Sequence, residues 1–204
     1  KALVEVEYEE LKLVTCPAEA LAEGAPLVHS TGNILSHEHL VRGDADRVIR
    51  ESKYKVTRHY ETPWTEHAFL EPECAVAMPM GDGVLIYSTD QSVYDTQHET
   101  CILLGLPPEK VIVENKLVGG GFGGKEDVTV QHQAALIAYL TKRAVKVKLT
   151  RKESIIIHPK RHPMSIDMTT ACDENGYLTA MKAVVVSDTG AYASLGGPVL
   201  QRAC

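Results

Sequence analysis

The stretch Gly119-Gly120-Gly121-Phe122-Gly123-Gly124-Lys125-Glu126 places five glycines around one aromatic residue. Glycines are entropically costly to order, so this density indicates a backbone that needs positive φ or a close approach to another group. An apolar extended run precedes the stretch, and a helical pattern over 127–140 follows it. The first N–H groups of such a helix favour an anionic or oxo-bearing ligand. The sequence therefore predicts a loop that binds through its main chain.

Other interpretations of these glycines are weaker. A Gly-rich turn often only reverses the chain. The stretch lacks the Gly-Lys-Ser/Thr ending of a phosphate-binding loop, and it matches the dinucleotide pattern GxGxxG only loosely. The ending Lys125-Glu126 is more informative, because a carboxylate at a helix N-terminus stays ionised and accepts a hydrogen bond or a proton from a bound heterocycle.

The composition of the 204-residue chain is that of an ordinary globular protein. Hydrophobic residues make up 44% and charged residues 24%, and the length suffices for one or two domains with a sizeable core. The net charge of −6 argues against nucleic acid and acidic membranes as partners, because both require a basic surface. No apolar run approaches the roughly 18 residues that a membrane span requires, so no membrane partner is expected.

Cysteine and histidine patterns argue against a metal ion held by side chains of this chain. The five cysteines are dispersed without a CxxC pair, which indicates buried thiols in a reducing compartment and predicts a cytoplasmic location. Zinc and iron–sulfur centres need clustered thiolates. The run His37-Glu38-His39 is a candidate metal-ligating pattern, but an isolated His-x-His without further ligands is more typical of a solvated loop.

The first forty residues are predicted to form a separate segment. Apolar alternation over 2–8 indicates a strand, and a proline followed by apolar residues predicts a short helix over 17–21. The stretch 29–43 is polar and typical of a linker, so we expect a domain boundary near residue 40. The chain also starts within a strand pattern and without methionine, which we interpret as part of a longer polypeptide.

The centre of the chain alternates between strands and helices. Asp44 is expected to cap a helix that ends at Glu51. Beyond it we predict strands over 53–61, 74–78, 84–88, 110–118 and 144–150 and a tight turn at 81–83. Helices are predicted over 92–104, where Gly105 stops the helix, and over 127–140. Such alternation favours parallel strands with right-handed crossovers. Gln91 and the glycines would then lie at the carboxyl ends of strands, with two helix N-termini facing one crevice.

The last third of the sequence is predicted to end in a long hairpin. The charged run Arg151-Lys152-Glu153 is interpreted as a solvated rim. Alternating segments over 164–172 and 177–187 flank the turn sequence Asp-Glu-Asn-Gly at 173–176. The predicted fold class is therefore α+β, a mixed α/β arrangement in which a mixed sheet contains strand-helix-strand units and a long C-terminal β-hairpin follows.

The glycine stretch resembles the signature loop of the molybdenum hydroxylases, the family of xanthine dehydrogenase and aldehyde oxidase, at all eight positions. In that family the backbone of the Phe-Gly step lies against the molybdenum cofactor. The resemblance therefore implies that Gly121, Phe122 and Gly123 bind the cofactor. It also places Glu126 where purine-hydroxylating members carry a substrate-binding glutamate.

Gln91 follows Ser88-Thr89-Asp90 and resembles the glutamine that ends a Ser-Thr-Gln step in this family. That glutamine contacts the metal-oxo group. Asp90 is an extra residue relative to the family pattern, while Gln97 sits at the expected distance downstream. Taken alone, Gln91 is more readily explained as a surface residue or a helix cap, but an amide donates a hydrogen bond without being titrated. The resemblance implies that Gln91 and Phe122 lie near the oxo ligands and that no side chain ligates the metal.

The resemblance implies a function in heterocycle oxidation. The expected reaction is hydroxylation of a purine or related N-heterocycle, with oxygen from water and electrons passing from molybdenum to iron–sulfur and flavin partners. The cofactor would be molybdopterin, in its simple or its cytosine dinucleotide form, with Fe–S and FAD on other domains or subunits. Residues 1–40 resemble the end of a hammerhead-like domain with its linker, and 41–204 the first molybdopterin-binding domain of the molybdenum subunit.

Three alternatives stay open at this point. The family's general base is a glutamate expected beyond Cys204, so the chain by itself is expected to be incomplete as a catalyst, and a non-catalytic cofactor-binding or assembly module is one alternative. An aldehyde-oxidising member is the second, although such members tend to lack the glutamate that Glu126 resembles. A phosphate-cradling nucleotide binder is the third.

Overall fold

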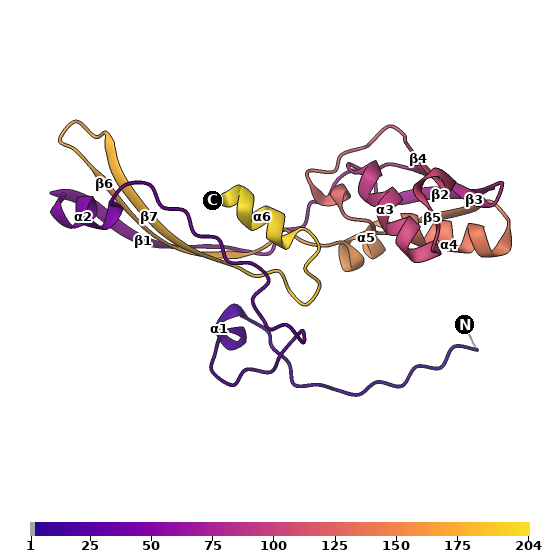
Figure 1. Cartoon of the computed structure of the whole chain (residues 1–204), viewed down its shortest axis with the longest axis horizontal. Coiled ribbons are helices and arrows are strands. Elements are labelled where there is room, and N and C mark those ends of the chain that lie inside the picture. Colours follow the sequence, from indigo (N-terminus) through magenta and orange to yellow (C-terminus); the bar gives the residue numbers. More distant parts are fainter. Residues whose placement is uncertain (1–2) are drawn as a thin grey trace. The chain divides into compact units, whose positions relative to one another are not determined.

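The computed structural model describes residues 3–204 and divides the chain into two compact units (Figure 1). The unit Trp64–Arg161 contains the glycine stretch, and we call it the loop unit. The residues up to Pro63 together with His162–Cys204 form the second unit, which we call the hairpin unit. This division into compact units differs from the domain boundary expected near residue 40. That boundary separates two domains defined by resemblance to a family, and it stays a prediction.

A four-stranded sheet in the order β4-β3-β2-β5 forms the frame of the loop unit. Its strands are β2 (Cys74–Met80), β3 (Gly83–Ser88), β4 (Val111–Asn115) and β5 (Val145–Lys148). The hairpin of β2 and β3 is antiparallel, as predicted, whereas β3 and β4 run parallel. Parallel pairing was predicted for the strands that alternate with helices; it is correct for β3 and β4 and wrong for β5, which pairs with β2 in the antiparallel sense.

Two helices pack against this sheet and one another, α3 (Val93–Leu104) and α4 (Gln131–Thr141). Ile86 and Val111 are fully buried in the sheet, and three alanines of α4 let that helix approach closely: Ala134, Ala135 and Ala138. As predicted, α3 ends at Gly105, whose positive φ of 63° allows the αL cap. The short 3-10 turn η1 (Pro108–Lys110) leads into β4.

The hairpin unit contains a three-stranded antiparallel sheet in the order β1-β6-β7. Its strands are β1 (Tyr54–Thr62), β6 (Met164–Cys172) and β7 (Leu178–Ser187), which confirms the predicted long hairpin. Helix α2 (Ala45–Glu51) packs on β6 and β7, and the Asp44 side chain caps it by accepting a hydrogen bond from Arg47 N at 2.9 Å. Two further helices in this unit are α1 (Pro17–Ala20) and α6 (Gly196–Ala203).

The start of α4 corrects a prediction that concerned the glycines. Residues Gly124–Glu126 form a separate 3-10 turn, η2, and the backbone is extended at Asp127. Helix α4 begins only at Gln131, so the glycines do not open it. We expected two helix N-termini at one crevice. That of α3 follows the predicted site residue Gln91 directly, whereas that of α4 is separated from the glycines by η2 and the segment after it.

Two further predictions are wrong. Residues 3–8 are exposed and form no strand, because their alternation finds no partner strand among the described residues. The run after Thr150 is helix α5 (Arg151–Ile157), which starts with a capping box between Thr150 and Glu153. Arg151 is accordingly not a solvated rim residue, since its guanidinium donates to the carbonyl oxygens of Phe69 and Leu70.

Over residues 3–204, none of the helices has the length and apolar character needed to cross a membrane.

Candidate functional site

The glycine loop, Gly119–Glu126, follows the end of β4 and lies beside the end of β3. These strands are parallel neighbours, so their carboxyl ends share one edge of the sheet, as predicted. Asn115 fixes this edge: its side-chain amide donates to Asp90 O at 2.9 Å, and its amide oxygen accepts from Asp90 N at 3.3 Å. The backbone therefore delivers Gln91 directly to the loop.

Gln91 holds the glycine loop through three hydrogen bonds. Its Oε1 accepts from Gly123 N at 3.0 Å and from Lys125 N at 3.3 Å, and its backbone N donates to Lys125 O at 2.8 Å. A Cβ at Gly121 would lie 2.2 Å from Oε1, so any other residue there would displace the Gln91 amide from these bonds. Because Oε1 is occupied by two donors, the NH2 group points away from them, and it has no partner among residues 3–204. The structure thus brings together Gln91 and the loop, as predicted.

The tip of the loop presents three consecutive backbone N–H groups without a hydrogen-bond partner in the part of the chain that the structure describes: those of Gly120, Gly121 and Phe122. The backbone around them is left-handed, with φ of 92° at Gly120, 55° at Phe122 and 88° at Gly123. Successive N–H groups in such conformations form a concave donor surface that binds anions and oxo groups. Gly123 N, in contrast, is occupied by Gln91, so at the Phe-Gly step only the amide of Phe122 is available.

Phe122 is held in its unusual conformation from outside the loop. Its positive φ is uncommon for a residue with a side chain and costs about 1–3 kcal/mol. Arg161 donates from Nη2 to the Phe122 carbonyl oxygen at 2.9 Å, which helps to offset that cost. The Phe122 ring is 62% exposed and does not belong to the core. It is available for contact with another molecule or segment.

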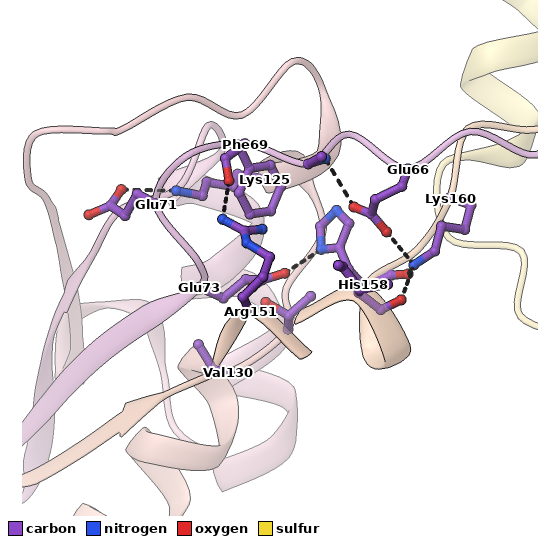
Figure 2. Close-up of polar contacts among 12 residues, drawn as sticks. Glu66, Phe69, Glu71, Glu73, Lys125, Val130, Arg151, His158 and Lys160 are labelled. Atoms are coloured by element: carbon purple, nitrogen blue, oxygen red, sulfur yellow. Dashed lines mark hydrogen bonds and ion pairs between the residues drawn. The ribbon is translucent and has the colours of Figure 1, made fainter. Parts of the chain in front are cut away.

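An ion pair with one buried member, Lys125, links the loop to Glu71 (Figure 2). Lys125, whose side chain is only 2% exposed, places Nζ 2.9 Å from Glu71 Oε2 and 4.7 Å from the centre of the Phe69 ring. Glu71 Oε2 also accepts from Gly119 N at 2.8 Å. Partial burial opposes ionisation of Glu71, but the hydrogen bond from Gly119 and the Lys125 ammonium outweigh it and lower the pKa of this carboxyl. Sequence reasoning missed this pair; two glutamates in the run Leu70-Glu71-Pro72-Glu73 were the available signal.

A second polar cluster supports the other end of the loop (Figure 2). Glu73 and His158 are both buried, with Oε1 and Nδ1 2.6 Å apart. Burial lowers the pKa of His158, although the charges of Glu73 and Glu66 oppose that shift. The imidazole lies directly against the loop, because a Cβ at Gly124 would come within 2.6 Å of its Nε2. The loop therefore rests on side chains that only glycine permits it to approach.

Glu126, the predicted substrate-binding residue, lies half-buried in the 3-10 turn η2. The helix N-terminus that we expected beside it is not there, because α4 starts five residues later, at Gln131. The next residue, Asp127, has its pKa raised to about 6 by burial and by the charge of Glu126. Two adjacent carboxyl groups therefore lie at the end of the loop and just after it, and burial brings the pKa of the second, Asp127, closer to neutral pH.

The chain offers little for direct metal ligation. Within residues 3–204 there is no group of three or more His, Cys, Asp or Glu side chains that could hold a metal ion. Cys16 and Cys204 are exposed free thiols, so the prediction of buried cysteines is wrong for these two, while the other three are half-buried. Neutral donors of the loop and of Gln91, rather than metal ligands, are what this site offers.

Comparison with known proteins assigns the family. Residues 28–204 match the molybdopterin cofactor-binding domain family. The chain is 38% identical to a probable xanthine dehydrogenase subunit of Bacillus subtilis, over 97% of its own length and 27% of that protein. It is 38% identical to the nicotinate dehydrogenase large molybdopterin subunit of Eubacterium barkeri, over 98% of the chain and 47% of that subunit. The chain thus spans between about a quarter and a half of the length of these relatives.

Solved structures share the fold. The aldehyde oxidoreductase of Desulfovibrio gigas superposes with a TM-score of 0.83 at 24% identity, over 90% of this chain and 21% of that one. Quinoline 2-oxidoreductase of Pseudomonas putida gives 0.82 at 24% identity, over 94% and 25%. These likenesses confirm the predicted mixed α+β fold class. With the loop sequence and the family match, they show that the chain belongs to the molybdopterin cofactor-binding domain family of the molybdenum hydroxylases.

Proposed function

We propose that this chain holds the molybdopterin cofactor of a molybdenum hydroxylase against its glycine loop. The observation that carries the proposal is a set of uncharged donors without acceptors in the described chain: the N–H groups of Gly120, Gly121 and Phe122 and the NH2 group of Gln91. Metal-oxo groups are acceptors, and neutral donors hold them without adding charge or titrating. The residues present therefore fit the cofactor.

When bound, the cofactor supplies oxidation of a carbon atom with oxygen taken from water. The chain's own residues bind and orient. Gln91 both shapes the loop through Oε1 and offers its NH2 group, so one side chain couples the loop conformation to ligand contact. Iron–sulfur and flavin partners, the cytosine dinucleotide form of the cofactor and a cytoplasmic location belong to this proposal as expectations from the family resemblance and the dispersed free thiols.

For the substrate, we propose a purine or a related N-heterocycle that Glu126 binds at a ring heteroatom. A well-aimed hydrogen bond of this kind contributes about 3–4 kcal/mol to transition-state stabilisation. The likeness to aldehyde oxidoreductase is a likeness of fold at 24% identity, so it does not favour an aldehyde substrate. The curated relatives at 38% identity, named as xanthine and nicotinate dehydrogenase subunits, support the heterocycle instead.

The cofactor proposal is tested on the full-length protein by measuring bound molybdenum and pterin. Gln91→Leu removes the NH2 donor and frees the loop, so molybdenum content should fall at least several-fold. Gln133→Leu is the matched control, since Gln133 is an exposed residue of α4 whose amide nitrogen donates to Thr129 O within its own segment. Wild-type protein without molybdenum would contradict the proposal, and cofactor without turnover of any heterocycle or aldehyde would favour the assembly module.

The substrate proposal is tested by steady-state kinetics of Glu126→Gln. We expect kcat/KM to fall about 100-fold for heterocycles, because the charged acceptor is lost, and to change little for aldehydes. An equal loss on both substrate classes would indicate that Glu126 acts in folding or cofactor binding instead.

A further inference from the structure

One carboxylate oxygen joins the two ends of the glycine loop. Glu71 Oε2 accepts from Gly119 N at 2.8 Å and contacts Lys125 Nζ at 2.9 Å, while Glu71 N donates to Gly119 O at 3.1 Å. Glu71 and Lys125 are 54 positions apart in the sequence, so this closure is a tertiary contact (Figure 2). Both ends of the loop between Gly119 and Lys125 are therefore held by the Glu71 side chain. We call the loop closed in this way the arch and the residues 120–122 its tip.

This closure sorts the amide groups of the loop into two sets. The N–H groups near the two ends of the loop are hydrogen-bonded: Gly119 N donates to Glu71 and Lys125 N donates to Gln91. The N–H groups of the tip, at 120–122, have no acceptor within residues 3–204. Because the Lys125 side chain is only 2% exposed, its ammonium stays beside Glu71 and holds the second end of the loop there.

We propose that Glu71 and Lys125 are positioning residues that keep the glycine loop in the arch whose tip N–H groups bind the cofactor. Neither residue needs to touch the cofactor, because both act through the loop backbone. The identity of the ligand rests on the proposed function above. The positioning role of Glu71 and Lys125, which we call the clamp, rests only on the contacts within the loop unit. Glu71 and Lys125 are thus assigned a role that the motif alone does not give them.

Stability and positioning are separable because only one partner is buried: the Lys125 side chain is 2% exposed and the Glu71 side chain 34% exposed. Removing Glu71 leaves the buried Lys125 ammonium uncompensated, and removing Lys125 leaves the partly solvated Glu71 carboxylate without its partner, so either single change lowers stability whatever the loop does. Replacing both partners by apolar side chains of similar size removes the unpaired charge, so the fold recovers while the clamp is still absent. If the pair only stabilised the fold, the double variant would regain stability, wild-type hydrogen exchange in the loop and wild-type molybdenum content.

The test compares Lys125→Met and the double variant Glu71→Met/Lys125→Met in the full-length protein, by hydrogen exchange and molybdenum content. We expect the hydrogen-bonded amides of Gly119, Gly123 and Lys125 to exchange about tenfold faster in both variants, with α4 unchanged in the double variant, and bound molybdenum to fall several-fold. Lys116→Met is the matched control, because Lys116 pairs with Glu114 at the same 2.9 Å but is 51% exposed. It should alter neither readout.

The outcomes separate the two proposals. A double variant that regains stability and shows wild-type exchange in the loop overturns the clamp. Should Lys125→Met fail to fold, the double variant decides, since it carries no unpaired charge. Wild-type protein that holds no molybdenum refutes the proposed function, but exchange in the loop still tests the clamp.

Discussion

The loop unit and the hairpin unit are stabilised in different ways. All buried hydrophobic residues among the described ones lie in the loop unit, with the single exception of Ala171 in β6. In the hairpin unit, β1 is exposed at every position along its length. Its strands are held by main-chain ladders and by surface pairs such as Thr57 with Thr169. The site therefore sits on the unit that has a packed core, which keeps its geometry fixed.

Among the described residues, the ion pairs with a buried member lie in the loop unit, although that unit also has exposed pairs such as Lys116 with Glu114. Lys125 with Glu71 and His158 with Glu73 have buried members, whereas Lys182 with Asp46 is exposed on both sides at a similar distance of 2.7 Å. Exposed pairs contribute about 0–1 kcal/mol, while breaking a buried pair costs about 3–5 kcal/mol. Distance alone therefore says little about the importance of an ion pair, and burial decides.

The largest contrast is expected from apolar truncation. Ile86→Ala, in the centre of β3 at 0% exposure, should lower the free energy of unfolding by about 2–5 kcal/mol through lost burial and a cavity. Val184→Ala in β7, at 56% exposure, should change it by less than about 0.5 kcal/mol. Urea unfolding followed by hydrogen exchange reports each unit separately. Equal effects of the two substitutions would remove the distinction between the units.

Glycine substitutions give the next effect and differ in sign. Gly124→Ala would place its Cβ 2.6 Å from His158 Nε2, so we expect a loss of about 1–3 kcal/mol in the free energy of unfolding. Gly197→Ala in α6 meets nothing within 4 Å and needs no positive φ, so it should stabilise by up to about 1 kcal/mol. Thermal unfolding of both variants checks the pair. A neutral Gly124→Ala would mean that His158 moves freely behind the loop.

Asp127 should make the loop unit sensitive to pH. Burial raises its pKa from 3.8 to about 6, so the folded state binds this proton more tightly than the unfolded state does. The resulting stabilisation is fully present below pH 3.8 and is lost as the pH rises through about 6. Asp127→Asn should therefore stabilise the protein at pH 8 by about 1 kcal/mol, after allowance for solvent screening, and have little effect at low pH. Unfolding measured at both pH values provides the test.

His59 should give the smallest effect, in the hairpin unit. Hydrogen bonds to Asp167 and Glu61 raise the pKa of this exposed imidazole above 6.5. Its contribution to stability is thus full below pH 6.5 and is lost as the pH rises through the raised pKa. His59→Gln should flatten this part of the pH profile only slightly, because solvent screens the contacts. A change larger than that of Asp127→Asn would contradict the comparison of the two units.

The sequence by itself determined the local features and the family. Asp44 as a helix cap, Gly105 as a helix end and the turn at 173–176 are encoded by residues within a few positions of one another, so their side-chain types suffice to predict them. The glycine loop and the placement of Gln91 beside it followed from the motif and from strand order. These predictions needed no knowledge of distant contacts.

Only the tertiary structure decided which groups of the loop are free. The late start of α4, the antiparallel pairing of β5 and the occupation of Gly123 N by Gln91 depend on contacts between distant segments. Glu71 and Lys125 meet across 54 positions, and no local pattern links them. The physical reason is that burial of a charge depends on which chain segments surround it. That arrangement exists only once the sheet has assembled.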